Sequence, residues 1–187
     1  MVGSRAFWIL AGGAAAVDLI SKWWIFQWLG DEGWSYTVIE GFFTLRGVHN
    51  SGGVWGIGQD YRWAFAVVRL VALFVILYLY KTTRHRSAAF VVGLGLIFGG
   101  AVGNLWDTLF VTGGAGGGGG GVRDFLEFDL QFMVWPTFNL ADSFITVGAV
   151  FLFVHFFFVG EQLPGGASAS ASTEGADGVG ASSSDPK

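Results

Sequence analysis

The sequence predicts an all-α membrane protein, a four-transmembrane-helix bundle with a small β-rich extracytoplasmic subdomain between helices 1 and 2. Composition is the first reason: 52% of the residues are hydrophobic and only 13% are charged, whereas soluble domains carry about 25% charged residues. The second is that four stretches approach or exceed the ~20 apolar residues of a spanning helix. The third is a β-branched and aromatic segment after the first stretch. The predicted spans are roughly Ala6–Leu29, Trp63–Tyr80, Ala88–Val111 and Thr137–Val159.

The first span has some features of a cleaved signal peptide. Arg5 precedes an apolar run that contains the small residues Ala14–Ala16, as in a secretory signal. Hydrophobicity resumes at Trp23–Phe26 without any turn residues in between. We therefore interpret the stretch as an uncleaved membrane span.

The outer segment of about residues 31–62 is predicted to form short strands. Tyr36–Glu40 and Phe42–Val48 are rich in β-branched and aromatic residues and are separated by Gly41, a pattern typical of strands. His49–Gly53 has the composition of a turn. A small sheet with an aromatic face, lying on the outer membrane surface, is the expected result.

Charge predicts the orientation of the four spans. The loop Lys81–Arg86 holds three of the ten basic residues of the chain, and loops rich in Lys and Arg stay in the cytoplasm. Both termini are then cytoplasmic, and the segments 31–62 and 112–136 face outward. A four-span membrane domain is expected over residues 1–163, with a Gly-rich insertion at 113–121. The tail 164–187 is Gly, Ala, Ser and acidic residues without an aromatic residue, so we expect it to be disordered in the cytoplasm.

Composition also excludes several kinds of site. The chain has no Cys, which excludes disulfides, thiolate metal ligands and a cysteine nucleophile. His49, His85 and His155 are far apart in sequence, so no metal site and no cofactor are predicted. No basic stripe is present, and nucleic acid is not an expected partner.

Three acids near the outer ends of the last two spans are candidate functional residues. They are Asp107, Asp124 and Asp142. An ionised carboxylate is costly in or near lipid, and such residues are therefore functional candidates by default. Asn139 and Asp142 also have the spacing of a capping box at a helix start, and a helix N-terminus favours the ionised carboxylate. The spacing alone leaves open whether Asp107 or Asp124 is the partner of Asp142.

Other polar residues inside the spans have structural interpretations. Asp18 and Lys22 are spaced for an i, i+4 ion pair, with the acid in the better N-terminal position. Span three carries a row of small residues, Gly95, Gly99 and Gly103, that lets another helix approach closely. Arg69 in span two either reaches the interface or faces the bundle, and the sequence does not decide between these.

Several motifs, in order along the chain, resemble the lipoprotein signal peptidase (signal peptidase II) family. They are Asp18-x-x-x-Lys22, Glu40-Gly41-Phe42-Phe43, His49-Asn50-Ser51-Gly52-Gly53, Gly99-Gly100-Ala101-Val102-Gly103-Asn104-Leu105-x-Asp107, Asp124-Phe125 and Phe138-Asn139-Leu140-Ala141-Asp142-Ser143. The resemblance implies an aspartyl endopeptidase of the bacterial inner membrane. Such an enzyme removes the signal peptide of a prolipoprotein just before its lipid-modified cysteine. The implied partners are lipid-modified prolipoproteins and membrane lipids, and no cofactor or metal is implied.

The resemblance also implies roles for particular residues. Asp124 and Asp142 match the two catalytic acids of the family. The matching substrate-binding or supporting residues are Asn50, Gly52, Asn104, Asp107, Asn139, Asp18 and Lys22.

The chain departs from the family pattern at two places. The family has an arginine where this chain has Thr108, and the 17 positions from Asp107 to Asp124 make a longer connection than in the family. A longer loop costs little closure entropy, but the missing arginine removes a cation beside the acids, for which Arg123 or Arg69 could substitute. Two other hypotheses stay open: a catalytically impaired family member that acts as a membrane scaffold, and a small proton-coupled transporter.

The predicted orientation can be tested by cysteine labelling, because the chain has no native Cys. In an Arg84→Cys variant, a membrane-impermeant thiol reagent should label the protein only after the cytoplasmic side has been opened. Labelling in intact cells would invert the orientation and place the acids at the cytoplasmic face.

Overall fold

The computed structural model describes residues 4–30, 33–50, 62–83, 86–112 and 121–158. The predicted tail 164–187, Gly52 and all but the last residue of the Gly-rich insertion lie outside these ranges. Four helices in the described part are long and apolar enough to cross a membrane. They are α1 (Ser4–Leu29), α2 (Arg62–Thr82), α3 (Ala88–Phe110) and α4 (Leu140–Phe158). The four predicted spans are thus confirmed as helices, with one change: Thr137 and Phe138 belong to a strand and not to the fourth helix.

The β structure is larger than predicted and comes from two separate parts of the chain. The segment after α1 forms β1 (Ser35–Ile39) and β2 (Phe43–Asn50), close to the predicted strands. The segment after α3 adds β3 (Val122–Asp129) and β4 (Val134–Phe138), and the four strands form one antiparallel sheet in the order β1-β2-β3-β4. The predicted β-rich segment between helices 1 and 2 is therefore confirmed as strands, but it supplies only two of the four strands of the sheet, and the other two were not predicted. Pro136 in β4 fits an edge strand, since proline cannot donate a hydrogen bond to a neighbouring strand.

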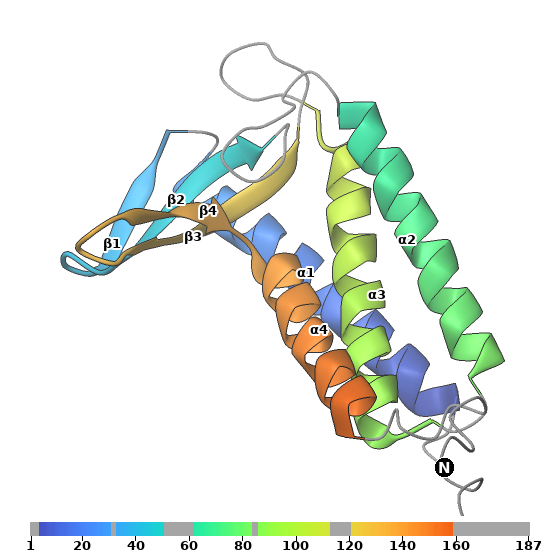
Figure 1. The fold of residues 1–187 in the computed structure, drawn as a ribbon. Helices are drawn as coiled ribbons and strands as arrows, with labels where there is room; N and C mark the ends of the chain where they lie inside the picture. The colour runs from blue at the N-terminus through green and yellow to red at the C-terminus, as the bar shows by residue number, and fades with distance from the viewer. Residues whose placement is uncertain (1–3, 31–32, 51–61, 84–85, 113–120, 159–187) are drawn as a thin grey trace, which may run out of the picture.

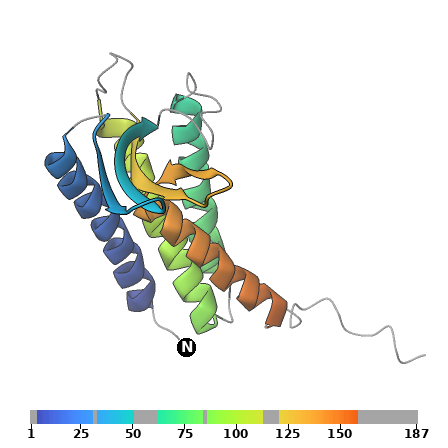
Figure 2. The ribbon, with the colours of Figure 1, turned by 90° about the vertical axis from the view of Figure 1, so that its left-hand side faces the viewer.

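The sheet lies at one end of the helical bundle, where α1 and α3 end and α2 and α4 begin (Figure 1). It curves over this end of the bundle, as Figure 2 shows. Phe125 of β3 packs with Ile25 and Phe26 near the end of α1, and these buried side chains attach the sheet to the helices.

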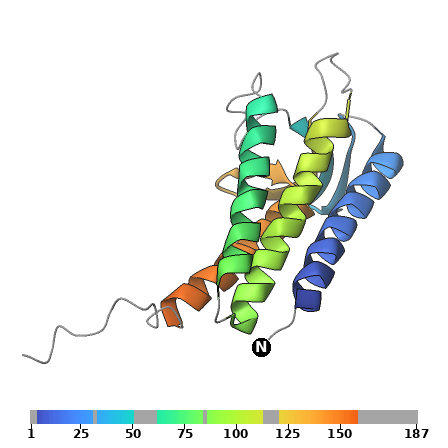
Figure 3. The same ribbon diagram turned by 90° about the vertical axis from the view of Figure 1, so that its right-hand side faces the viewer.

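Helix α3 is the centre of the bundle, with α1, α2 and α4 packed around it; Figure 3 shows it between α1 and α2. Its glycines make close contacts on two sides. A Cβ on Gly99 would lie 2.5 Å from the carbonyl oxygen of Ala11 in α1, and one on Gly100 would lie 2.5 Å from the carbonyl oxygen of Ala141 in α4. Gly103 similarly leaves room for the carboxylate of Asp18. The predicted row of small residues therefore faces α1.

The close approach of α1 and α3 predicts the effect of adding one methyl group. Gly99→Ala should destabilise the protein by about 1–3 kcal/mol, because the new Cβ meets the backbone of α1 and one of the helices must shift. The matched control is Gly12→Ala in α1, where a Cβ would have no neighbour within 4 Å. Thermal unfolding of the purified proteins should show a lower Tm for the first variant only. Equal Tm values would mean that the helices do not pack this closely.

Candidate functional site

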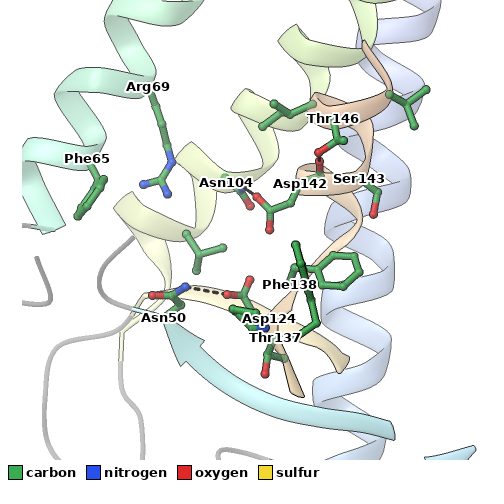
Figure 4. Close-up of a pocket in the computed structure, with 15 residues that line it drawn as sticks. Asn50, Phe65, Arg69, Asn104, Asp124, Thr137, Phe138, Asp142, Ser143 and Thr146 are labelled. Carbon is green, nitrogen blue, oxygen red and sulfur yellow. Dashed lines mark hydrogen bonds between the residues drawn. The ribbon is translucent and has the colours of Figure 1, made fainter. Parts of the chain in front are cut away.

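Two of the predicted acids face one cavity. Asp124 comes from β3 and Asp142 from the first turn of α4, and both line a cavity of about 670 Å³ between α2, α3, α4 and the sheet (Figure 4). Asp124 lies directly opposite Val48 of β2. Residues two apart share one face of a strand, so Asn50 lies on the same face as Asp124 and its Nδ2 donates to Asp124 Oδ2 at 2.9 Å.

Asn139 connects the two acids. Its side-chain Nδ2 donates to Asp124 Oδ1 at 2.5 Å, and its backbone N–H donates to Asp142 Oδ2 at 3.2 Å. The Asp142 backbone N–H donates in return to Asn139 Oδ1 at 3.1 Å, which completes the predicted capping box. The start of α4 therefore places Asp142 and holds Asp124 through one residue.

Burial changes the acidity of Asp124. Removal from water, the larger cause, and the nearby charge of Asp142 together raise the pKa of Asp124 from 3.8 to about 7. The amides of Asn50 and Asn139 and the ammonium of Lys22 act in the opposite direction without cancelling the effect. Near neutral pH one of two neighbouring acids thus retains a proton, which is the arrangement of two carboxyl groups that act as acid and base.

A chain of buried charges lies behind this pair. Lys22 Nζ is 2.7 Å from Asp18 Oδ2 and 3.6 Å from Asp107 Oδ2, and it donates to Asn104 Oδ1 at 2.8 Å. Asp18 Oδ1 accepts a hydrogen bond from the backbone N–H of Ala141, the second residue of α4. The predicted Asp18–Lys22 pair is confirmed as a contact.

Asp107 is engaged by Arg123, the residue before Asp124. Arg123 donates to both carboxylate oxygens of Asp107, at 2.7 Å from Nη2 and 3.1 Å from Nε, and its backbone N–H adds a third bond at 3.0 Å. Asp107 is fully buried and is not among the residues that line the cavity. It holds the start of β3, whereas Asp124 faces the cavity.

Of the remaining predicted site residues, Asn104 and Asn50 line the cavity, and Gly52 does not belong to the described part of the chain. Asn104 lines the cavity, and its Nδ2 donates to Asp142 Oδ1 at 2.9 Å. Asn50 lines the cavity from the end of β2, and together with His49 it belongs to a strand, so the predicted turn cannot begin before residue 51.

Sequence reasoning did not identify the apolar side of the cavity or the position of Arg69. The other lining residues are Phe65, Arg69, Val122, Trp135, Pro136, Thr137, Phe138, Ser143, Ile145, Thr146 and Val147. Helical spacing does place Phe65 and Arg69, at i and i+4, on one face of α2. No signal in the sequence shows that this face meets the acids, because that depends on how α2 packs on α3.

The family model and the sequence relatives agree on one family. The model of the signal peptidase (SPase) II family matches residues 10–158. Similar proteins include the lipoprotein signal peptidase of Bacillus pumilus, 35% identical over 83% of this chain and 95% of the relative. Those of Symbiobacterium thermophilum and Rhodopirellula baltica are 37% and 35% identical, over 79% and 90% of this chain and 91% and 83% of the relatives. A solved structure of a bacterial membrane enzyme has the same fold, with a TM-score of 0.71 at 24% identity over 82% of this chain and 88% of that chain.

The raised pKa of Asp124 predicts how stability depends on pH. Because the folded-state pKa of about 7 lies above the ordinary value of 3.8, the folded protein keeps a proton that the unfolded chain releases. The resulting stability is fully present below pH 3.8 and is lost as the pH rises through about 7. The Tm of the wild type should therefore fall relative to that of Asp124→Asn between about pH 4 and 7, and the difference should level off above this range. A difference that stays constant with pH would contradict the raised pKa.

Proposed function

The chain belongs to the signal peptidase II family, and we propose that it is an intramembrane aspartyl endopeptidase that uses Asp124 and Asp142 as its catalytic pair. Its proposed substrates are diacylglyceryl-modified prolipoproteins, and the cut lies just before the lipidated cysteine. The observation that carries the proposal is the pair itself. Two carboxyl groups, bridged by Asn139, face one cavity, and one of them keeps its proton near neutral pH.

The two carboxyl groups suit the two halves of peptide hydrolysis. Asp142 lies at the N-terminus of α4, where the helix dipole favours a carboxylate, and it is the proposed base that takes a proton from water. The water oxygen attacks the scissile carbonyl carbon while protonated Asp124 gives its proton to the carbonyl oxygen. The intermediate collapses when Asp142 passes its new proton to the leaving amine and Asp124 recovers one from a hydroxyl group. Both acids thereby return to their starting states.

The walls of the cavity suit a substrate that is part lipid and part peptide. Within the described residues, α2 packs on α3 and hardly touches α4, yet both α2 and α4 line the cavity. Apolar side chains such as Phe65, Ile145 and Val147 lie on these two walls. Acyl chains could remain in the lipid between the helices while the peptide reaches the acids beside the sheet.

The proposed location follows from the two ends of the bundle. The sheet end carries exposed aromatic side chains, Trp34, Tyr36 and Trp135 among them, and such residues are enriched at membrane interfaces. The basic residues Lys81 and Arg86 flank the connection between α2 and α3 at the opposite end. We therefore place the protein in the bacterial inner membrane, with the catalytic pair at the extracytoplasmic face and both termini in the cytoplasm.

Two substitutions test the proposed catalytic pair. Asp124→Asn and Asp142→Asn should each lower kcat/KM for a diacylglyceryl-modified precursor peptide on the order of 10³-fold or more, since each removes one half of the acid–base pair. Asp129→Asn is the matched control. Asp129 ends the same strand as Asp124 and lies outside the cavity, where it accepts a hydrogen bond from the Gln131 backbone.

The assay is cleavage of the peptide by purified protein, with mass spectrometry to locate the cut. Full activity in either folded Asp124→Asn or Asp142→Asn would remove that residue from the pair. Failure of the wild type to cleave the lipidated peptide would refute the proposed function.

A further inference from the structure

Arg69 is a charged residue within the apolar helix α2, and its presence there calls for a physical explanation. Its Nη1 donates to Thr108 Oγ1 of α3 at 2.9 Å, and its guanidinium lies 5.8 Å from the ring centroid of Phe65, one turn earlier in α2. The side chain extends from α2 toward the cavity that also holds Asp124 and Asp142 (Figure 4). An arginine inside a membrane span is costly and usually serves a function.

The other two cations near the cavity already have partners. Lys22 pairs with Asp18 and Asp107, and Arg123 binds Asp107 through two oxygens. In the described part of the chain, no carboxylate lies within ion-pair distance of Arg69. The carboxylates of Asp142, Asp124 and Asp107 nevertheless interact with it electrostatically, and Asp142 does so most strongly.

The charges around the cavity balance only when Arg69 is included. Four acids and three cations gather here, from α1, α2, α3, β3 and α4. They are Asp18, Asp107, Asp124, Asp142, Lys22, Arg69 and Arg123. If the catalytic pair shares one proton, the acids carry three negative charges against three positive ones. Without Arg69, one negative charge would be left uncompensated in a region of low dielectric, which is costly.

We propose that Arg69 is the electrostatic partner of the catalytic pair, a positioning residue that keeps Asp124 and Asp142 singly protonated. The proposal rests on the proposed function, because it assigns Arg69 to that site. Electrostatic interactions are reciprocal, so a guanidinium that interacts with both acids stabilises the ionised one in turn. The hydrogen bond to Thr108 fixes where this charge lies.

Removing the charge of Arg69 should raise the pH at which the pair loses its shared proton. Arg69→Gln is the best variant, since glutamine can still donate a hydrogen bond to Thr108 but is neutral. Both limbs of the kcat/KM–pH profile should therefore move to higher pH by roughly one unit, because each ionisation of the pair loses the same stabilising charge. On the acid side, where the pair gains a second proton and lacks its base, kcat/KM should fall about tenfold, and on the alkaline side it should rise. A purely structural role would lower the rate at every pH.

Two further variants show whether charge is the cause. Adding Thr108→Arg to Arg69→Gln returns a guanidinium to the same place from α3, and it should move the pH profile back toward that of the wild type. Arg46→Gln is the control: this cation pairs with Glu127 on the sheet at 3.3 Å, and its side chain is 51% exposed. Its loss should leave the pH profile unchanged.

A second measurement needs no substrate. The difference in Tm between a protein that has Asp124 and its Asp124→Asn variant, followed against pH, reports the pH at which Asp124 loses its proton. We expect this pH to be higher by roughly one unit when both proteins also carry Arg69→Gln. An unchanged transition would overturn the proposal for Arg69, even if the wild type cleaves its substrate. A raised transition in a protein that cleaves nothing would support the electrostatic role and refute the proposed function. Failure of a folded Arg69→Gln/Thr108→Arg variant to lower the transition again would also overturn the proposal.

Discussion

The site depends on the ion pairs and the hydrogen bond that the ammonium group of Lys22 makes. This group joins Asp18 of its own helix to Asp107 and Asn104 of α3, and Asp107 in turn holds Arg123 at the start of β3. Removing one partner of such a buried network typically costs about 3–5 kcal/mol, because the remaining charge loses its compensation. The network also fixes the two acids from opposite sides. Asp18 binds the backbone at the start of α4, and Arg123 immediately precedes Asp124.

Backbone packing makes this charge network possible. Lys22 can reach α3 only because α1 lies close to it, and Gly99 and Gly103 provide that proximity. Gly100 does the same for α4 on the other side of α3. Since helices in a membrane gain little from the hydrophobic effect, close packing and polar contacts supply most of their association energy. The glycine contacts and the ion pairs are therefore parts of one interface, and neither would form readily without the other.

Local features of the structure were predictable from the sequence, and non-local ones were not. The four helices follow from runs of apolar residues, and the Asn139–Asp142 capping box follows from a spacing of three. Strands β3 and β4 were missed because a glycine run precedes them and because their pairing with β2 joins segments that are far apart in sequence. Whether Asp107 or Asp124 is the partner of Asp142 could not be decided from the sequence for the same reason, a contact between distant segments. It depends on the contact of Asp107 with Arg123, which no spacing rule gives. The resemblance to the family supplied that choice, but it could not place Arg69 opposite Thr108.

The division of the sheet between two chain segments has a consequence for biogenesis. A chain that emerges from the ribosome presents β2 long before β3, and the two strands can pair only after α2 and α3 have been made. Asp142 follows later still, in the last helix. No nascent fragment that stops short of α4 possesses both acids, so under the proposed function a half-inserted chain could not yet cut peptide bonds. Completion of the last membrane helix would then be the step that activates the proposed peptidase.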